Sequence, residues 1–278
     1  MITAPINRII PYSVVDGPGN RTSIFLQGCN IRCAYCHNPE TQNTCCNCGI
    51  CIDVCKSSAL SLVDGKVIWD EEKCTMCDSC INICPHNASP KIKMMTSEEL
   101  FMEVKKNIPF IRGITVSGGE CTLHPEFLLE LFTLAKAEKL TCLIDSNGMV
   151  DFTLYPELLK KCDGVMLDVK AWNLSIYKKL TGFGNDIVKK NLKLLSDKNK
   201  IEELRIVCMP NEVDAEDVIQ GITQIIGEKV ADTKLKLIKF RHYGVKGKLE
   251  NIKSPDDEYM DNLHQKAIKA GFKKIILT

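Results

Sequence analysis

Short runs of apolar and β-branched residues alternate with helical patterns along most of this chain. The candidate strands are residues 23–27, 113–117, 140–145, 164–169, 204–209 and 235–240. Two helix starts are visible between them, since Thr96-Ser97-Glu98-Glu99 can form a capping box and Pro125 suits a first helical turn. Strands that alternate with helices predict an α/β fold with a parallel sheet and crossover connections.

This alternation stops at residues 41–94, the cysteine-rich segment. Apart from Cys46, its cysteines form two copies of C-x2-C-x2-C-x3-C, the pattern of bacterial two-cluster ferredoxins, in which the fourth cysteine of each run binds the other run's 4Fe-4S cluster. One predicted cluster therefore has the ligands Cys45, Cys48, Cys51 and Cys84, and the other has Cys74, Cys77, Cys80 and Cys55. Cys46 is interpreted as a spare thiol, and zinc is the alternative metal.

Residues 59–69, between the two cysteine runs, predict a hairpin that turns at Asp64-Gly65. So small a unit has little apolar core, and we expect its clusters to hold it folded. The prediction is thus a discontinuous main domain, residues 1–40 and 95–278, with a ferredoxin-like insert at 41–94.

Composition limits the class of protein. The chain has 278 residues, 45% hydrophobic and 26% charged, with a net charge of +1, which gives no case for a nucleic-acid or anionic-membrane partner. The first residues lack the apolar core of a signal peptide, and no run approaches the ~18 apolar residues of a membrane span. We therefore expect a cytoplasmic protein. In a reducing compartment, sixteen cysteines indicate metal ligation.

Three cysteines outside the segment have a different spacing. Cys29, Cys33 and Cys36 form C-x3-C-x2-C, which can hold three irons of a 4Fe-4S cluster and leave the fourth open to a small molecule. A closed zinc site would need a fourth ligand, for which the adjacent His37 is poorly placed. With Tyr35 before the last cysteine, the motif resembles the radical S-adenosylmethionine (SAM) enzymes, in which SAM chelates the open iron.

That resemblance implies a partial (β/α)6 barrel of TIM type, with its reactive groups at the carboxyl ends of the strands. There, Gly118-Gly119-Glu120 resembles the motif that holds the SAM amino group. The runs that begin at Asp145-Ser146 and at Asp168 resemble the glycyl radical enzyme activating enzymes. The SAM-binding residues implied in this way are Tyr35, Gly118, Gly119, Glu120, Asp145, Ser146, Asp168, Lys170 and Arg205, with Arg241 or His242 near the ribose.

Some of these positions have more than one interpretation. In the family, Lys170 lies against the SAM carboxylate, and Asp145 and Asp168 help to form a site for a monovalent cation, Na+ or K+. Asp145 can instead be a helix N-cap, and Arg205 can be a structural salt bridge. The other histidines, His37, His86, His124 and His264, are interpreted as non-catalytic.

The run from Ser13 to Arg21 resembles the same activating enzymes and places Asp16 near the glycyl loop of a partner protein. Over essentially the whole chain, the resemblance is closest to the YjjW-type activases. The implied reaction is reductive cleavage of SAM to methionine and a 5'-deoxyadenosyl radical, which takes hydrogen from a backbone glycine of a glycyl radical enzyme. A flavodoxin or ferredoxin-type protein would donate the electron, and a monomer is expected. The alternatives are a maturase-type radical SAM enzyme with another substrate and a simple electron-transfer ferredoxin.

Overall fold

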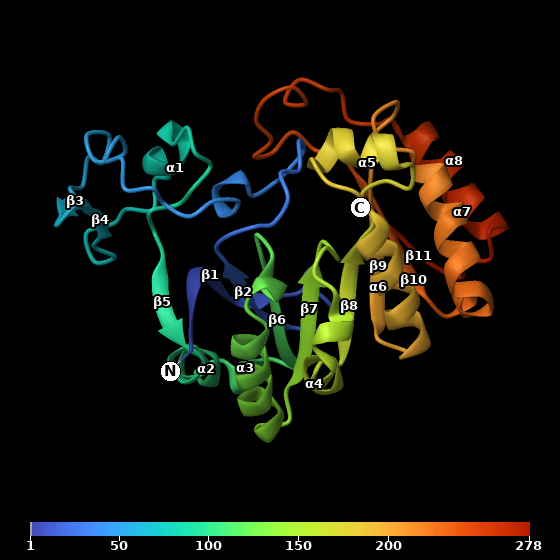
Figure 1. Cartoon of the computed structure of the whole chain (residues 1–278), viewed down its shortest axis with the longest axis horizontal. Coiled ribbons are helices and arrows are strands. Elements are labelled where there is room, and N and C mark those ends of the chain that lie inside the picture. The colour runs from blue at the N-terminus through green and yellow to red at the C-terminus, as the bar shows by residue number, and fades with distance from the viewer. Residues whose placement is uncertain (1) are drawn as a thin grey trace.

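The computed structural model describes residues 2–278, whose strands form a nine-stranded sheet and a separate hairpin (Figure 1). The order in the large sheet is β11-β10-β9-β8-β7-β6-β2-β1-β5. Its strands are β1 (Thr3–Ser13), β2 (Arg21–Leu26), β5 (Lys93–Thr96), β6 (Gly113–Gly118), β7 (Thr141–Ser146), β8 (Gly164–Asp168), β9 (Ile201–Cys208), β10 (Lys234–Lys239) and β11 (Lys274–Leu277). The six predicted strands are present as β2 and β6–β10, and they pair with one another in parallel, while β1 pairs antiparallel with β2; the predicted mostly parallel sheet is confirmed.

Helices connect these strands, and most of them cover one side of the sheet (Figure 1). They are α2 (Ser97–Lys105), α3 (Pro125–Ala137), α4 (Pro156–Lys161), α5 (Leu174–Thr181), α6 (Asp186–Asp197), α7 (Ala215–Ile226) and α8 (Asp257–Lys269), with α1 (Ser79–Ile83) in the cysteine-rich segment. Both predicted helix starts are confirmed. Thr96 and Glu99 form a reciprocal capping box on α2, and Pro125 opens α3.

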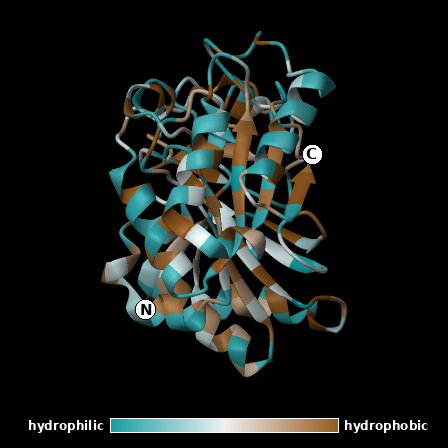
Figure 2. Ribbon diagram, turned by 90° about the vertical axis from the view of Figure 1, so that its right-hand side faces the viewer, coloured by the Kyte–Doolittle hydropathy of each residue, from teal (hydrophilic) through white to brown (hydrophobic). Residues whose placement is uncertain are grey.

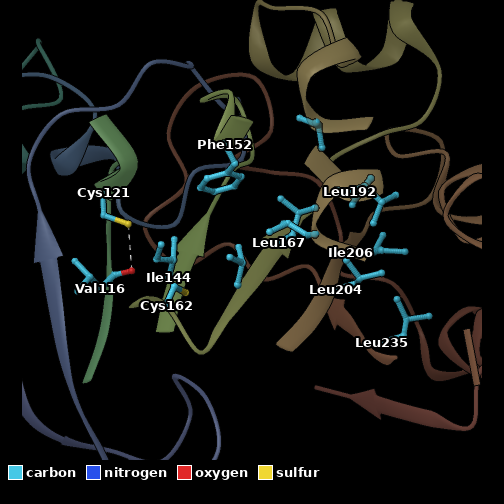
Figure 3. Packing of buried hydrophobic residues seen from close by; sticks show 14 of the residues in the cluster. Val116, Cys121, Ile144, Phe152, Cys162, Leu167, Leu192, Leu204, Ile206 and Leu235 are labelled. Atoms are coloured by element: carbon cyan, nitrogen blue, oxygen red, sulfur yellow. Dashed lines mark hydrogen bonds between the residues drawn. The ribbon is translucent and has the colours of Figure 1, made fainter. Parts of the chain in front are cut away.

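The two faces of the parallel strands differ because successive side chains point to opposite sides. One face is apolar and packs against the helices, with Val116, Ile144, Leu167 and Ile206 in one continuous core (Figure 3). Figure 2 shows the same division, with hydrophobic strands inside and hydrophilic residues on the helices. Polar side chains such as Thr115 and Asp145 occupy the other face, which leaves that face free to form a site.

The amino ends of β2, β6 and β7 are joined by Arg21, which is 1% exposed. Its guanidinium donates to the Thr115 hydroxyl (2.7 Å), the Thr141 hydroxyl (2.9 Å) and the Ile114 carbonyl (2.6 Å). These bonds satisfy a buried cation and fix the register of three strands. The polar face is therefore braced at the end opposite the cysteines.

The cysteine-rich segment contains the predicted hairpin, β3 (Leu60–Val63) and β4 (Lys66–Trp69), paired antiparallel. Asp64 and Gly65 both have positive φ, as a type I′ turn requires. Its core is small and separate from the main one, with only Cys51, Leu60 and Cys80 fully buried within it among the residues described. The expected boundary at 94/95 falls inside β5, which pairs with β1 at the edge of the large sheet. No described helix is long and apolar enough to cross a bilayer.

Candidate active site

A cavity of about 230 Å³ lies where the carboxyl ends of the parallel strands meet the Cys29–Cys36 loop. Most of the predicted site residues line it: Cys29, Cys33, Tyr35, Cys36, Gly118, Gly119, Asp145, Ser146, Asp168, Lys170 and Arg205. They come from the loop after β2 and from the ends of β6, β7, β8 and β9. The parallel topology explains this convergence, because it places every strand's carboxyl end at the same edge.

The loop that carries the three cysteines is held by backbone hydrogen bonds from neighbouring elements. The Cys29 amide donates to the Gln42 carbonyl (2.9 Å), and the Arg32 and Ala34 amides donate to carbonyls at the end of α5. Burial raises the pKa of the Cys29 thiol to about 11 and that of Cys33 to about 12. Thiolates here therefore need compensating positive charge, which an iron-sulfur cluster supplies.

Lys170 provides a fixed positive charge beside the cysteines. Its ammonium donates to an Asp168 carboxylate oxygen (3.0 Å) and lies 5.7 Å from the centre of the Tyr35 ring. Burial works to lower the Lys170 pKa, but Asp168 and Cys33 outweigh it and raise that pKa well above 10.5. A permanently charged, buried ammonium at this position can bind a carboxylate or another anion.

Arg205 on β9 reaches across β8 to β7. Its guanidinium donates to an Asp145 carboxylate oxygen (2.9 Å) and to a Glu203 oxygen (2.7 Å), and a further nitrogen lies 3.0 Å from the Met166 sulfur. Burial raises the pKa of Asp145, while Arg205 acts against that rise. The structure thus shows Arg205 in the structural salt bridge that was the alternative to SAM binding, although its side chain still borders the cavity.

Gly118 and Gly119 allow the ends of β6 and β2 to approach closely. A Cβ at Gly118, where φ is +118°, would lie 2.2 Å from the Leu26 backbone, and one at Gly119 would lie 2.2 Å from the Gly28 carbonyl oxygen. These contacts exclude any larger residue. The glycines therefore hold the cysteine loop against β6, in addition to lining the cavity.

Glu120 does not border the cavity. Its buried carboxylate accepts hydrogen bonds from the Thr122 amide and hydroxyl, from the Ser146 hydroxyl (3.0 Å) and from the Asn147 amide (2.7 Å). Burial raises its pKa, and these hydrogen bonds oppose the rise. In this arrangement Glu120 braces the loop after β7. The motif had instead predicted that Glu120 accepts from an ammonium group.

Arg241 and His242 also lie outside the cavity, and both are exposed. The His242 Nδ1 lies 2.8 Å from the Glu250 carbonyl oxygen, and the Arg241 carbonyl contacts the His37 Nε2 (3.0 Å). His37, which was interpreted as non-catalytic, lines the cavity and stacks on Phe240. The sequence around residues 241–242 does not show which of these side chains points into the cavity.

Asn147 is a site residue that the sequence did not indicate, although it belongs to the run that begins at Asp145-Ser146. The Asn147 amide side chain lies 3.6 Å from the Cys29 sulfur and donates to the Asn30 side chain (2.9 Å). Gln42 was also missed, and it borders the cavity from the other side. Both residues donate to the cysteine loop, a role that has no spacing signature in the sequence.

Two buried hydroxyl groups near the cysteines lack hydrogen-bond partners within residues 2–278, those of Tyr35 and Tyr177. Each is influenced by the charges of Lys170 and Cys33, and burial raises the pKa of each phenol. An unsatisfied buried hydroxyl costs about 1–3 kcal/mol. Of the two, Tyr35 lines the cavity beside the half-buried thiols, and its orphaned hydroxyl fits a site that is completed by a further polar group.

The cysteine-rich segment has two small cavities that divide its cysteines in the predicted way. Cys45, Cys48, Cys51 and Cys84 line the first, which we call the near cavity. Cys55, Cys74, Cys77 and Cys80 line the second, and Cys80 also borders the near cavity. Cys46 lines the near cavity too, and its sulfur lies within 4.8 Å of the ligand atoms of Cys48 and His86. The spare thiol is therefore close to a predicted cluster site.

Asp16 lies away from the cavity, on the polar face of the strands. Its carboxylate accepts from the hydroxyls of Ser13 (2.5 Å) and Ser23 (2.7 Å), and its carbonyl accepts from Thr115 (2.6 Å). The neighbouring Val14 and Val15 are 75% and 68% exposed. The turn is thus anchored by Asp16 and presents apolar side chains to solvent.

Residues 23–220 match the model of the radical SAM superfamily. The chain belongs to this superfamily. The matched region contains the three-cysteine loop, the cysteine-rich segment and the strand ends that form the cavity. This radical SAM protein is therefore an enzyme of an iron-sulfur family, which explains why three half-buried thiols meet beside Lys170.

Relatives specify the family further. A Haemophilus influenzae protein named for the glycyl-radical enzyme activating enzymes is 30% identical, over 99% of this chain and 97% of its own length. The 4-hydroxyphenylacetate decarboxylase activating enzyme of Clostridium scatologenes is 34% identical over 84% of this chain and 81% of the relative. A solved domain of pyruvate-formate lyase-activating enzyme from Bacteroides vulgatus has the same fold, with a TM-score of 0.50, 18% identity and coverage of 60% of this chain and 98% of that domain. Within the superfamily, this radical SAM protein belongs to the glycyl-radical enzyme activating enzymes.

Proposed function

We propose that this radical SAM protein cleaves SAM reductively and uses the 5'-deoxyadenosyl radical to remove a hydrogen atom from a backbone glycine of a partner enzyme. When bound by Cys29, Cys33 and Cys36, a 4Fe-4S cluster supplies one electron to the sulfonium of SAM. Methionine, 5'-deoxyadenosine and a glycyl radical are the products. The observation that carries the proposal is the single cavity in which these cysteines meet Lys170 and the strand-end carboxylates.

The residues around the cavity have distinct proposed tasks. The Lys170 ammonium holds the SAM carboxylate, and Gly118, Gly119 and Ser146 offer polar groups to its amino group. Tyr35 lines the cavity with its ring against Lys170. Asp145 and Asp168 are the proposed ligands of a monovalent cation, with Arg205 beside them as a further cationic group. The enzyme itself orients the substrate and excludes water, while the cofactor carries out the electron transfer.

The cysteine-rich segment has a proposed auxiliary role. Its two cavities would hold one 4Fe-4S cluster each, in a ferredoxin-like insert at residues 41–94, and a flavodoxin or ferredoxin-type protein would be the electron donor. The partner is a glycyl radical enzyme, whose glycyl loop would approach the turn at Asp16. The exposed Val14 and Val15 beside Asp16 support a docking role for this turn.

Anaerobic reconstitution tests the proposal. Three clusters of four irons give about twelve irons per chain, and a one-electron reductant with SAM should yield methionine and 5'-deoxyadenosine. Cys33→Ala should lose about four irons and all cleavage, whereas the matched change Cys162→Ala, in the apolar core, should lose neither. Cleavage that survives in Cys33→Ala would contradict the assignment of the site. Addition of a glycyl radical enzyme should then produce a glycyl radical signal by electron paramagnetic resonance (EPR).

A further inference from the structure

The chain that returns from the cysteine-rich segment runs beside the chain that leaves the three-cysteine loop. The Ser89 amide donates to the Glu40 carbonyl (2.9 Å), and the Asn43 amide donates to the Asn87 carbonyl (3.2 Å). The Asn43 side chain also donates to the His86 carbonyl (2.7 Å). Residues 86–89 follow Cys84, a residue of the near cavity, so these bonds join the near cavity to the active-site loop.

Gln42 lies at the centre of this junction and is 7% exposed. Its carbonyl accepts from the Cys29 amide (2.9 Å), and its side-chain amide donates to the Cys33 carbonyl (3.4 Å). Gln42 also lines the same cavity as Cys36. Its side-chain oxygen accepts from the Asn87 amide group (3.4 Å). One side chain thus contacts the three-cysteine loop at one end and the cysteine-rich segment at the other.

The position of Asn87 depends on the near cavity. Asn87 has φ of +48°, a left-handed conformation that asparagine tolerates, and it is three residues from Cys84. A group bound by Cys84 restrains this tight turn and with it the donor to Gln42. An amide donor held against the loop that binds a cluster places positive partial charge beside it, which favours the reduced, more negative cluster and raises its reduction potential.

We propose that Gln42 is a positioning residue that transmits the occupancy of the near cavity to the active-site cluster. The inference rests on the proposed function, because it requires a cluster at each site. Asn87 holds the Gln42 oxygen and so directs the amide donors toward the three-cysteine loop. With the near cavity empty, the turn at residues 86–89 is less restrained and Gln42 loses this orientation.

The test is an EPR-monitored redox titration of the full-length, reconstituted protein. The signal that changes when SAM is added identifies the active-site cluster. Gln42→Glu keeps the acceptor for Asn87 but removes the amide donor, and Cys84→Ser disrupts the near cavity. Each should lower the reduced fraction of the active-site cluster at a fixed potential on the order of tenfold, about 59 mV for one electron, because the amide donor beside the cluster is lost or misdirected.

The double variant decides between coupling and independence. If Gln42 transmits the effect, Gln42→Glu with Cys84→Ser shifts the potential no further than Gln42→Glu alone. Additive shifts, or an unchanged potential in Cys84→Ser, would overturn the inference. Gln42→Met, which has a side chain of similar length, serves as a second variant in case Gln42→Glu does not fold. Its potential should also shift no further when Cys84→Ser is added. Gln220→Met, on the exposed side of α7, is the control and should leave the potential unchanged. Wild-type protein without any SAM-sensitive signal would instead refute the proposed function, and the inference with it.

Discussion

Arg205 offers a stringent test of how the strand ends are held together. Its side chain is 11% exposed and pairs with Asp145 and Glu203, whose side chains are 16% and 7% exposed. Arg205→Met keeps most of the side-chain volume and removes the charge. Removing one partner of a buried ion pair costs about 3–5 kcal/mol, because the remaining charges are left uncompensated. We expect a loss of this size in the free energy of unfolding of the cluster-free protein near pH 8.

The loss should depend on pH in a definite direction. Burial raises the pKa of Asp145, and loss of Arg205 removes a group that holds that pKa down. The folded variant then binds a proton more tightly than the unfolded chain, whose Asp pKa is about 3.9. Stability of the variant therefore falls as pH rises through the raised pKa, and the deficit should shrink on acidification from about pH 8 toward about pH 5.

Urea denaturation of wild-type and variant protein at the two pH values measures these differences. The matched control is Arg8→Met, since Arg8 is 48% exposed and lies 3.9 Å from Glu40. Because Arg8 is half exposed and its distance to Glu40 is long, this pair should contribute only about 0–1 kcal/mol. Equal losses for the two variants would show that Arg205 is not a buried brace. A deficit at Arg205→Met that is constant with pH would refute the explanation through Asp145.

Three further predictions concern the other parts of the molecule. Cys48→Ala should lose about four irons but change SAM affinity by less than about twofold, or ~0.4 kcal/mol, because the SAM site lies on other elements. Cys46→Ala should keep all the iron. An equal iron loss in both variants would make Cys46 a ligand. Lys170→Gln should weaken SAM binding about 10- to 150-fold, which is the value of one hydrogen bond to a charged group. Equilibrium binding to the reconstituted protein measures this, and an unchanged affinity would exclude Lys170 as the partner of the SAM carboxylate. Asp16→Ala should leave uncoupled SAM cleavage in place but lower the glycyl radical yield, since a displacement of about 1 Å can cost roughly a hundredfold in rate; wild-type activation would leave the turn with a structural role only.

The local pattern of the sequence determined the elements that line the site. The six parallel strands, the hairpin at Asp64-Gly65 and the capping box at Thr96 were all predicted, because each depends on neighbouring residues and on the periodicity of one segment. Cysteines grouped by their spacing also line common cavities, although Cys80 borders two of them and Cys46 lines one. A metal-binding loop is short, so its ligands are close in the sequence as well as in space.

The tertiary structure alone decided what each polar side chain contacts. Arg205 on β9 and Asp145 on β7 are sixty positions apart in the sequence. They meet because both strands flank β8 in the sheet. Glu120 turns from the cavity toward the loop after β7, and Gln42 contacts Asn87, which lies 45 positions further along the chain. Such contacts depend on strand order, register and the direction of each side chain at a strand end. No periodicity within one segment encodes them, because the partners belong to segments that meet only in the folded chain.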